Sequence, residues 1–164
     1  MRERHIGTLR PETIPTKGAI MTRNLNYNRV MVILRGIPGC GKSTFGAFLF
    51  FIDCAAKDDP VRCSADQWMV DKTGNYQFDP KKLGYCHKMC QESAENACKM
   101  NIPLVIIENT NTKMDEMKPY LKIAETYGYM VFVLTVNNIH GCKDIHNVPD
   151  ASKDAMRQRF QHFL

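Results

Sequence analysis

Short runs of apolar residues alternate with longer amphipathic stretches along most of this chain. The first run, at 30–34, is continuously apolar and ends in a glycine-rich turn, which is typical of a strand covered on both faces. Further strands are predicted at 61–63, 104–107 and 130–136, with helices at 43–56, 80–100, 115–127 and 151–163. Because strands alternate with helices, the pattern predicts an α/β fold in which helices cover both faces of a parallel sheet.

Residues 1–28 differ from the rest of the chain. They are mostly polar or small, include two prolines, and show neither a strand nor a helix period. We therefore expect a flexible polar N-terminal arm at 1–28, followed by one domain at 29–164. The longest apolar run, at 45–52, is less than half of the roughly 20 residues that a membrane span needs, so no membrane partner is expected.

Composition narrows the class of protein. With 44% hydrophobic and 24% charged residues, the chain is typical of a soluble domain that needs neither disulfides nor a structural metal. Its seven cysteines are odd in number and form no CxxC pair, which favours reduced thiols in the cytoplasm. Cys86, His87 and Cys90 could share a helical face, but a second ligand pair for zinc is missing, so packed core thiols are expected. The net charge of +5 suits a polyanionic partner without naming one.

The turn after the first strand carries the clearest chemical signal. Residues 36–43 read GIPGCGKS and fit the pattern GxxxxGK[ST], directly between a buried strand and a helix. Glycines allow backbone N–H groups to surround phosphates, and the start of the helix adds positive field there. Lys42 is expected to reach the β- and γ-phosphates of ATP or another NTP, and Ser43 to hold Mg²⁺. The expected nucleotide-binding residues are Gly36, Pro38, Gly39, Cys40, Gly41, Lys42, Ser43 and Thr44.

Acidic residues follow the next two predicted strands, where ligand-binding groups gather in parallel sheets. Asp66 lies just past the second strand, and its carboxylate could accept the proton of an attacking hydroxyl group or could cap a helix. Glu108 ends the third strand and could bind Mg²⁺ through water. Trp68 could stack on an acceptor base or be buried against the second strand.

Amide and hydroxyl side chains continue this polar segment. Asn109, Thr110 and Asn111 offer hydrogen bonds to phosphate, water or a sugar hydroxyl, so they are expected to bind the acceptor. Asn111 and Thr112 are equally suited to capping the helix that follows.

Taken together, these motifs resemble the P-loop polynucleotide kinase family. The segments that carry the resemblance are 36–43, 64–66, 74–78, 106–117, 146–149 and 156–160, and the likeness runs from about Val30 to Phe160. It implies a three-layer P-loop NTPase fold with a C-terminal helical lid. It also implies transfer of the γ-phosphate of ATP to a 5′-hydroxyl end of DNA or RNA, as in nucleic acid repair, with Asp66 as general base and lid arginines on the donor phosphates.

Two positions depart from the family pattern. Met69 stands where similar kinases carry an arginine for the acceptor's phosphate, and Glu108 stands where aspartate is usual. Acceptor contacts are therefore expected to differ. In the predicted lid helix, Arg157 shares a face with Lys153, so we expect Arg157 to be the main phosphate contact and Arg159 the second.

Two other functions are compatible with the sequence. One is a small-molecule kinase with the same core, for which a closed acceptor pocket would be the mark in place of a basic groove. The other is a nucleotide-binding or nucleic-acid-binding module without catalysis.

Overall fold

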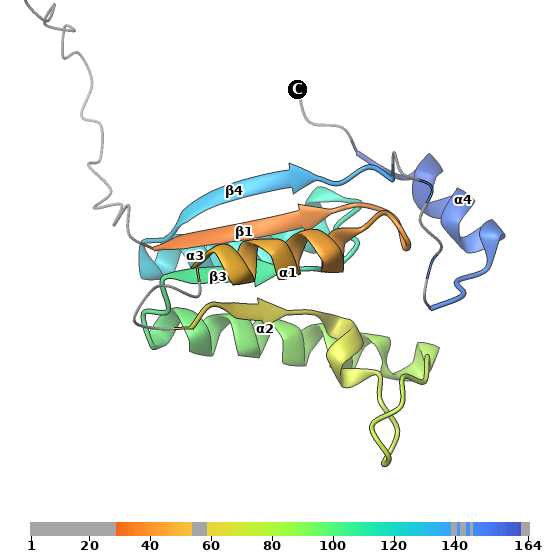
Figure 1. The fold of residues 1–164 in the computed structure, drawn as a ribbon, viewed down its shortest axis with the longest axis horizontal. Helices are drawn as coiled ribbons and strands as arrows, with labels where there is room; N and C mark the ends of the chain where they lie inside the picture. Colours follow the sequence, from red (N-terminus) through yellow and green to blue (C-terminus); the bar gives the residue numbers. More distant parts are fainter. Residues whose placement is uncertain (1–28, 54–58, 139–140, 142–143, 145, 162–164) are drawn as a thin grey trace, which may run out of the picture.

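A computed structural model describes residues 29–53, 59–138, 141, 144 and 146–161. Its four parallel strands form one sheet in the order β2-β3-β1-β4 (Figure 1). The strands are β1 (Val30–Arg35), β2 (Val61–Cys63), β3 (Leu104–Ile107) and β4 (Met130–Thr135). The N-terminal arm predicted at 1–28 lies outside the described residues.

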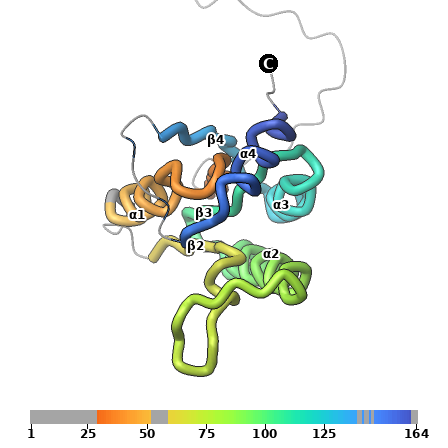
Figure 2. The backbone as a smooth tube through the Cα atoms, turned by 90° about the vertical axis from the view of Figure 1, so that its right-hand side faces the viewer, coloured from red at the N-terminus to blue at the C-terminus, as the bar shows by residue number. Residues whose placement is uncertain are grey.

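Helices cover both faces of this sheet. Helix α1 (Lys42–Asp53) packs on one face, and α2 (Leu83–Lys99) and α3 (Met114–Tyr127) pack on the other (Figure 2). Helix α4 (Asp150–Gln158) lies beyond the carboxyl ends of the strands, where the predicted lid belongs (Figure 1). Two short 3₁₀ helices, η1 (Ala65–Trp68) and η2 (Pro80–Lys82), lie between β2 and α2. The three-layer α/β fold predicted from the sequence is confirmed.

The apolar run of β1 explains these layers. Met31 and Ile33 point into the larger core beneath α2 and α3, whereas Val32 and Leu34 point toward Phe45 on α1. All four strand residues are 6% exposed or less. Successive side chains of a strand alternate between faces, so a strand between two helical layers needs apolar residues at every position.

Cysteines are packed in this core. Cys63, Cys86, Cys90 and Cys98 are all buried in the cluster between the sheet and α2. Burial raises the pKa of the Cys63 thiol to about 12 and that of Cys98 to about 11. The prediction of packed core thiols is confirmed for these residues.

Helix α4 ends earlier than the sequence predicted. It stops at Gln158, although the pattern predicted a helix to residue 163. Past this point the backbone N–H of Gln161 donates to the carbonyl of Thr112 at 2.9 Å, and Arg35 donates to the carbonyl of Gln161 at 2.6 Å. The Phe160 ring lies 4.5 Å from the Arg35 guanidinium. These contacts with distant segments replace the last predicted helical turn.

Strand β4 forms one edge of the sheet and carries exposed apolar side chains. Phe132, Val133 and Leu134 are 48%, 40% and 37% exposed. Among the helices that the structure describes, none has both the length and the apolar character needed to cross a membrane.

Helix α1 approaches the sheet closely at Gly46. A β-carbon at this position would lie 1.9 Å from Oε1 of Glu108, which directly follows β3. Two hydrogen bonds from Arg62 hold that carboxylate: Nε to Oε1 at 2.6 Å and Nη2 to Oε2 at 2.9 Å. The Glu108 side chain is only 4% exposed and that of Arg62 is 30% exposed, so α1 packs directly on a partly buried ion pair.

We expect Gly46→Ala to destabilise the protein even though alanine favours a helix by about 1 kcal/mol. The added methyl group would displace Glu108 from Arg62, and disturbing this partly buried ion pair should give a net loss of about 1–3 kcal/mol. Denaturant unfolding measures the change. Gly84→Ala in α2 is the matched control, because no atom lies within 4 Å of its added β-carbon. A Gly46→Ala variant as stable as Gly84→Ala would contradict the expectation.

Candidate active site

The predicted phosphate-binding turn connects β1 to α1. A β-carbon at Gly36 would lie 2.3 Å from Sγ of Cys40, so a larger residue would clash within the loop. At Gly39 it would lie 2.9 Å from Cβ of Asp144. Three glycines of the turn have positive φ angles, which glycine adopts without strain. These are Gly36 at 152°, Gly39 at 80° and Gly41 at 94°.

Lys42 folds its ammonium group into this turn. Nζ donates to the carbonyl oxygens of Gly36 at 3.0 Å and Ile37 at 3.1 Å. Burial lowers the pKa of Lys42, while its interactions with Cys40, Asp66 and Asp144 act in the opposite direction. The ammonium group therefore lies at the centre of the turn, within the electrostatic reach of two carboxylates from other parts of the chain.

The two predicted metal-binding residues differ in surroundings. Ser43 is exposed in the first turn of α1, as is the predicted nucleotide-binding residue Thr44. Glu108 is engaged by Arg62, whose Nη2 also donates to the carbonyl of Ser43 at 3.1 Å. Mg²⁺ prefers oxygen ligands and retains several waters, so the exposed Ser43 hydroxyl fits this ion better than the paired Glu108 carboxylate. Arg62 was missed from the sequence, although a charge inside a short strand signals a need for a counter-charge.

Asp66 lies in η1, directly after β2. Ser64 is the N-cap of this helix, and its Oγ accepts the backbone N–H of Asp66 at 3.2 Å. The alternative that the Asp66 carboxylate caps a helix is therefore wrong. Its side chain is 52% exposed and remains accessible from the carboxyl side of the sheet.

Asn109 is buried and holds η1 in place. Its Oδ1 accepts the backbone N–H of Ala65 at 2.8 Å, and its Nδ2 donates to the hydroxyl of Tyr120 at 2.9 Å and to Sγ of Cys90 at 3.4 Å. The structure thus places this predicted acceptor-binding residue in the core, where it fixes the turn that carries Asp66.

Thr110 and Asn111 contact the central strand and the phosphate-binding turn. The carbonyl of Thr110 accepts the N–H of Gly36 at 3.0 Å, and Nδ2 of Asn111 donates to the carbonyl of Leu34 at 2.8 Å. Asn111 is 1% exposed. These two predicted acceptor-binding residues therefore connect β3 to β1 at the base of the site.

The structure also distinguishes the alternatives predicted for Asn111, Thr112 and Trp68. The N-cap of α3 is Lys113, so the prediction that Asn111 or Thr112 caps this helix is wrong. Trp68 is 37% exposed and lines a cavity of about 340 Å³ together with Val61 of β2, so it is only partly buried against that strand.

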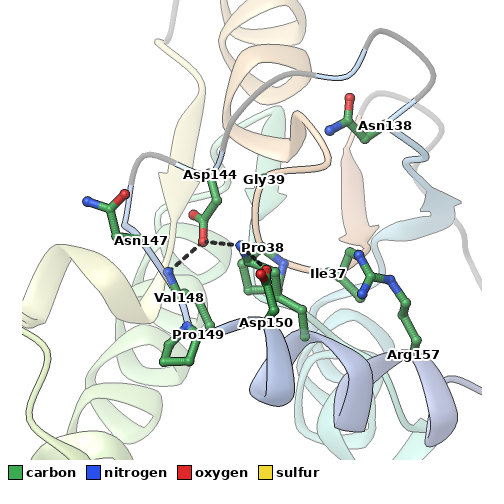
Figure 3. A pocket seen from close by; sticks show the side chains of 11 residues that line it. Ile37, Pro38, Gly39, Asn138, Asp144, Asn147, Val148, Pro149, Asp150 and Arg157 are labelled. Atoms are coloured by element: carbon green, nitrogen blue, oxygen red, sulfur yellow. Dashed lines mark hydrogen bonds and ion pairs between the residues drawn. The ribbon is translucent and has the colours of Figure 1, made fainter.

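A larger cavity of about 710 Å³ separates the phosphate-binding turn from α4 (Figure 3). Arg157 lies on its wall, forms an ion pair with Asp154 on α4, and has a 55% exposed side chain. Arg159 follows the helix, and its Nε donates to Oγ1 of Thr112 at 3.2 Å. Of the two predicted lid arginines, Arg157 thus faces the cavity. The turn contributes Ile37, Pro38 and Gly39 to this wall, and α4 contributes Asp150, Lys153 and Arg157.

Asp144 closes the cavity beside Gly39. Its carboxylate accepts the backbone N–H of Val148 at 2.7 Å (Figure 3). It also accepts the backbone N–H of His146 at 3.1 Å and lies 3.4 Å from Nζ of Lys153. Burial opposes ionisation, but these donors hold the pKa of Asp144 below its ordinary value. Asp144 was missed from the sequence because it lies in a connection without periodicity.

Curated relatives match only through part of their length. NEDD4-binding protein 2 of Homo sapiens is 30% identical over an alignment of 164 residues, which covers 91% of this chain and 8% of that protein. The motifs of this chain resemble this protein in particular, and the match confirms that resemblance. 2′,3′-Cyclic-nucleotide 3′-phosphodiesterase of Mus musculus is 24% identical over 110 residues, 67% of this chain and 24% of that protein. The chain therefore spans less than a quarter of the length of either relative.

Solved structures share the fold at low sequence identity. Kti12 of Chaetomium thermophilum, in complex with ADP-AlF3, has a TM-score of 0.54 and 13% identity over 80% of each chain. A chain of the Pnkp1/Rnl/Hen1 complex has a TM-score of 0.53 and 21% identity, covering 80% of this chain and 40% of that one. The APS kinase CysC of Mycobacterium tuberculosis has a TM-score of 0.51 and 10% identity over 80% of this chain and 96% of that one.

A family model agrees with the motifs and the geometry. The model described as AAA domain matches residues 31–162, which include the phosphate-binding turn, β1 from its second residue, the other three strands and α4. The turn, its lysine and the parallel sheet behind it have the form expected of a P-loop protein. The chain therefore belongs to this AAA-domain family, as a P-loop kinase-like domain.

Proposed function

We propose that this domain transfers the γ-phosphate of ATP to a 5′-hydroxyl end of DNA or RNA. The observation that carries the proposal is the position of the Asp66 carboxylate. It is exposed in η1, directly after β2, at the same carboxyl edge of the sheet as the P-loop that follows β1, and its negative charge acts to raise the pKa of the buried P-loop lysine Lys42. A hydroxyl group bound beside Asp66 would therefore lie close to the phosphates held by the P-loop.

The donor side of the proposed reaction is the cavity between the P-loop and α4. Backbone N–H groups of the turn would hold the phosphates, Lys42 would stabilise the charge that develops on them, and Arg157 would contact them from the lid. Ser43 would hold Mg²⁺, which supplies further neutralisation of phosphate charge when bound. Glu108, paired with Arg62, would support this region by fixing the carbonyl of Ser43.

The acceptor side of the proposed reaction is open. Asp66 exposes 52% of its side chain, which suits the end of a polymer better than a small molecule in an enclosed pocket. Among the structurally similar proteins, Pnkp1 occurs in an RNA repair complex. Asn109 would act on this side indirectly, since it fixes η1 through Ala65.

A transfer assay with γ-labelled ATP tests the proposal against its two alternatives. The acceptors are a 5′-hydroxyl DNA or RNA oligonucleotide, a nucleoside and water. We expect label on the oligonucleotide, and none with Lys42→Ala, because that variant lacks the lysine charge on the phosphates. Label only on the nucleoside would favour a small-molecule kinase, and nucleotide binding without any transfer would favour a non-catalytic module.

We expect Asp66→Asn to reduce transfer by about 10²–10⁴-fold, because an amide does not accept the hydroxyl proton. ATP affinity, measured by calorimetry, should stay within about threefold because Asp66 lies on the acceptor side. Asp59→Asn is the matched control, since it removes an equal, exposed charge before β2. An equal fall in ATP affinity and rate would instead assign Asp66 to the donor side.

We expect Arg157→Ala to lower the steady-state rate at saturating Mg²⁺ by about tenfold or more. Arg157→Lys should recover little of this loss, because the planar guanidinium donates paired hydrogen bonds that an ammonium group does not reproduce. Arg159→Ala should have the smaller effect, since Arg159 contacts Thr112. Wild-type rates in both Arg157 variants, with a large loss in Arg159→Ala, would reverse this assignment.

A further inference from the structure

A short segment joins the donor and acceptor sides of the site. We call Asp144 and residues 146–148 the strap. On the donor side, Asp144 packs against Gly39 of the P-loop and pairs with Lys153 of α4. Because Asp144 also accepts two backbone N–H groups of the strap, the P-loop, the lid and the strap share one buried carboxylate.

His146 extends from the strap to the acceptor side. Its Nε2 lies 3.7 Å from Oδ2 of Asp66, and its ring is 4.1 Å from the ring of Tyr76, between centroids, at an interplanar angle of 38°. The imidazole therefore contacts η1 and the loop that follows it. The His146 side chain is 27% exposed, about half the value for Asp66.

Titratable and charged groups near His146 belong to several elements. Asp66 belongs to η1, Tyr76 to the following loop, Asp144 to the strap and Lys153 to α4. Burial raises the pKa of Tyr76, and the negative charges of Asp66 and Asp144 raise it further. Both carboxylates therefore act on the same small region, although one lies on each side of the site.

We infer that His146 is a positioning residue, which orients the Asp66 carboxylate and couples it to the nucleotide side. The inference rests on the proposed function. An exposed aspartate is free to rotate, whereas an imidazole nitrogen 3.7 Å from Oδ2, at ion-pair rather than hydrogen-bond distance, would restrain that rotation and leave Oδ1 available to the acceptor. In the reaction, the hydroxyl oxygen bonds to the γ-phosphorus, its proton passes to Asp66, and the bond to the bridging oxygen breaks as ADP leaves. His146 neither gains nor loses a proton.

Two substitutions of His146 distinguish the contribution of the imidazole nitrogen from that of ring packing. His146→Phe keeps a ring for Tyr76 but has no donor, whereas His146→Gln keeps a polar donor without the ring. In the oligonucleotide transfer assay, His146→Phe should lower kcat by about tenfold or more, with the KM for ATP within about threefold. His146→Gln should recover kcat to within about threefold of wild type. Thermal unfolding of each variant verifies folding.

The reverse pattern would overturn the inference. Wild-type kcat in His146→Phe would mean that the ring serves only to pack on Tyr76, and no recovery in His146→Gln would mean that a polar donor at this position does not orient Asp66. A double-variant cycle adds a second criterion. In an Asp66→Asn background, His146→Phe should have little further effect, because His146 acts through the carboxylate. Independent, multiplicative losses would contradict this.

The chain's single tryptophan gives a measurement that needs no acceptor. Trp68 lies in η1 with Asp66, so its fluorescence reports on that helix. On titration with AMPPNP and Mg²⁺, the wild type should show a fluorescence change that falls by at least about half in His146→Phe and persists in His146→Gln, with Kd within about threefold.

The transfer assay and the fluorescence titration together distinguish failure of the inference from failure of the proposed function. AMPPNP binding without a change at Trp68 in the wild type, or an unaltered change in His146→Phe, would overturn the coupling through His146. No transfer to any acceptor by the wild type, alongside the expected fluorescence pattern, would reject the proposed kinase activity and retain the coupling. No AMPPNP binding at all would reject both.

Discussion

The carboxyl edge of this domain depends on the buried guanidinium of Arg35, the last residue of the central strand. It donates to the carbonyl oxygens of Asn111 at 2.8 Å, Thr112 at 3.3 Å and Gln161 at 2.6 Å, and stacks on Phe160. Burial lowers the pKa of Arg35, and the negative charge of Glu116 opposes that shift. A buried carbonyl that loses its donor costs about 1–3 kcal/mol, so one side chain holds both the connection after β3 and the chain after α4. The lid is thus anchored at the strand that carries the P-loop.

Two carboxylates at neighbouring strand ends have different surroundings. Glu108 is almost completely buried and is paired with Arg62, because a buried charge without a partner would strongly destabilise the fold. Asp66 has a 52% exposed side chain, and Nε2 of His146 lies 3.7 Å from its Oδ2. The buried carboxylate therefore organises α1 and the sheet, while the exposed one remains available to a substrate. Glu108 and Asp66 are both carboxylates, so the difference between them comes from their burial rather than from their residue type.

Local patterns predicted most of the fold. Strands β2 and β3 have the predicted bounds, and the P-loop follows β1 as expected, because each is specified by a short apolar run and its flanking turn. The end of α4 was not predictable in this way. Its last turn is replaced by contacts of Phe160 and Gln161 with Arg35, which is more than 120 residues earlier in the chain.

The site was predicted less completely than the fold. Position at a strand end located Asp66 and Asn109, but sequence spacing does not say which side chain turns toward solvent and which toward the core. Asn109 turns inward because the buried N–H of Ala65 needs an acceptor. Asp144 and His146 belong to an irregular connection, where no periodicity marks the residues that contact the P-loop or η1.

Alkylation of the packed thiols can report on local opening of this domain. A thiolate, not a thiol, attacks alkylating reagents, so the raised pKa values of Cys63, Cys86, Cys90 and Cys98 add to the shielding that burial provides. Three of these cysteines lie on the face of α2 that packs on the sheet. Their alkylation under native conditions requires α2 to separate from β2 and β3, so the rate of labelling measures how often that layer opens. Thiol labelling of these core cysteines therefore gives a measure of local opening in this domain.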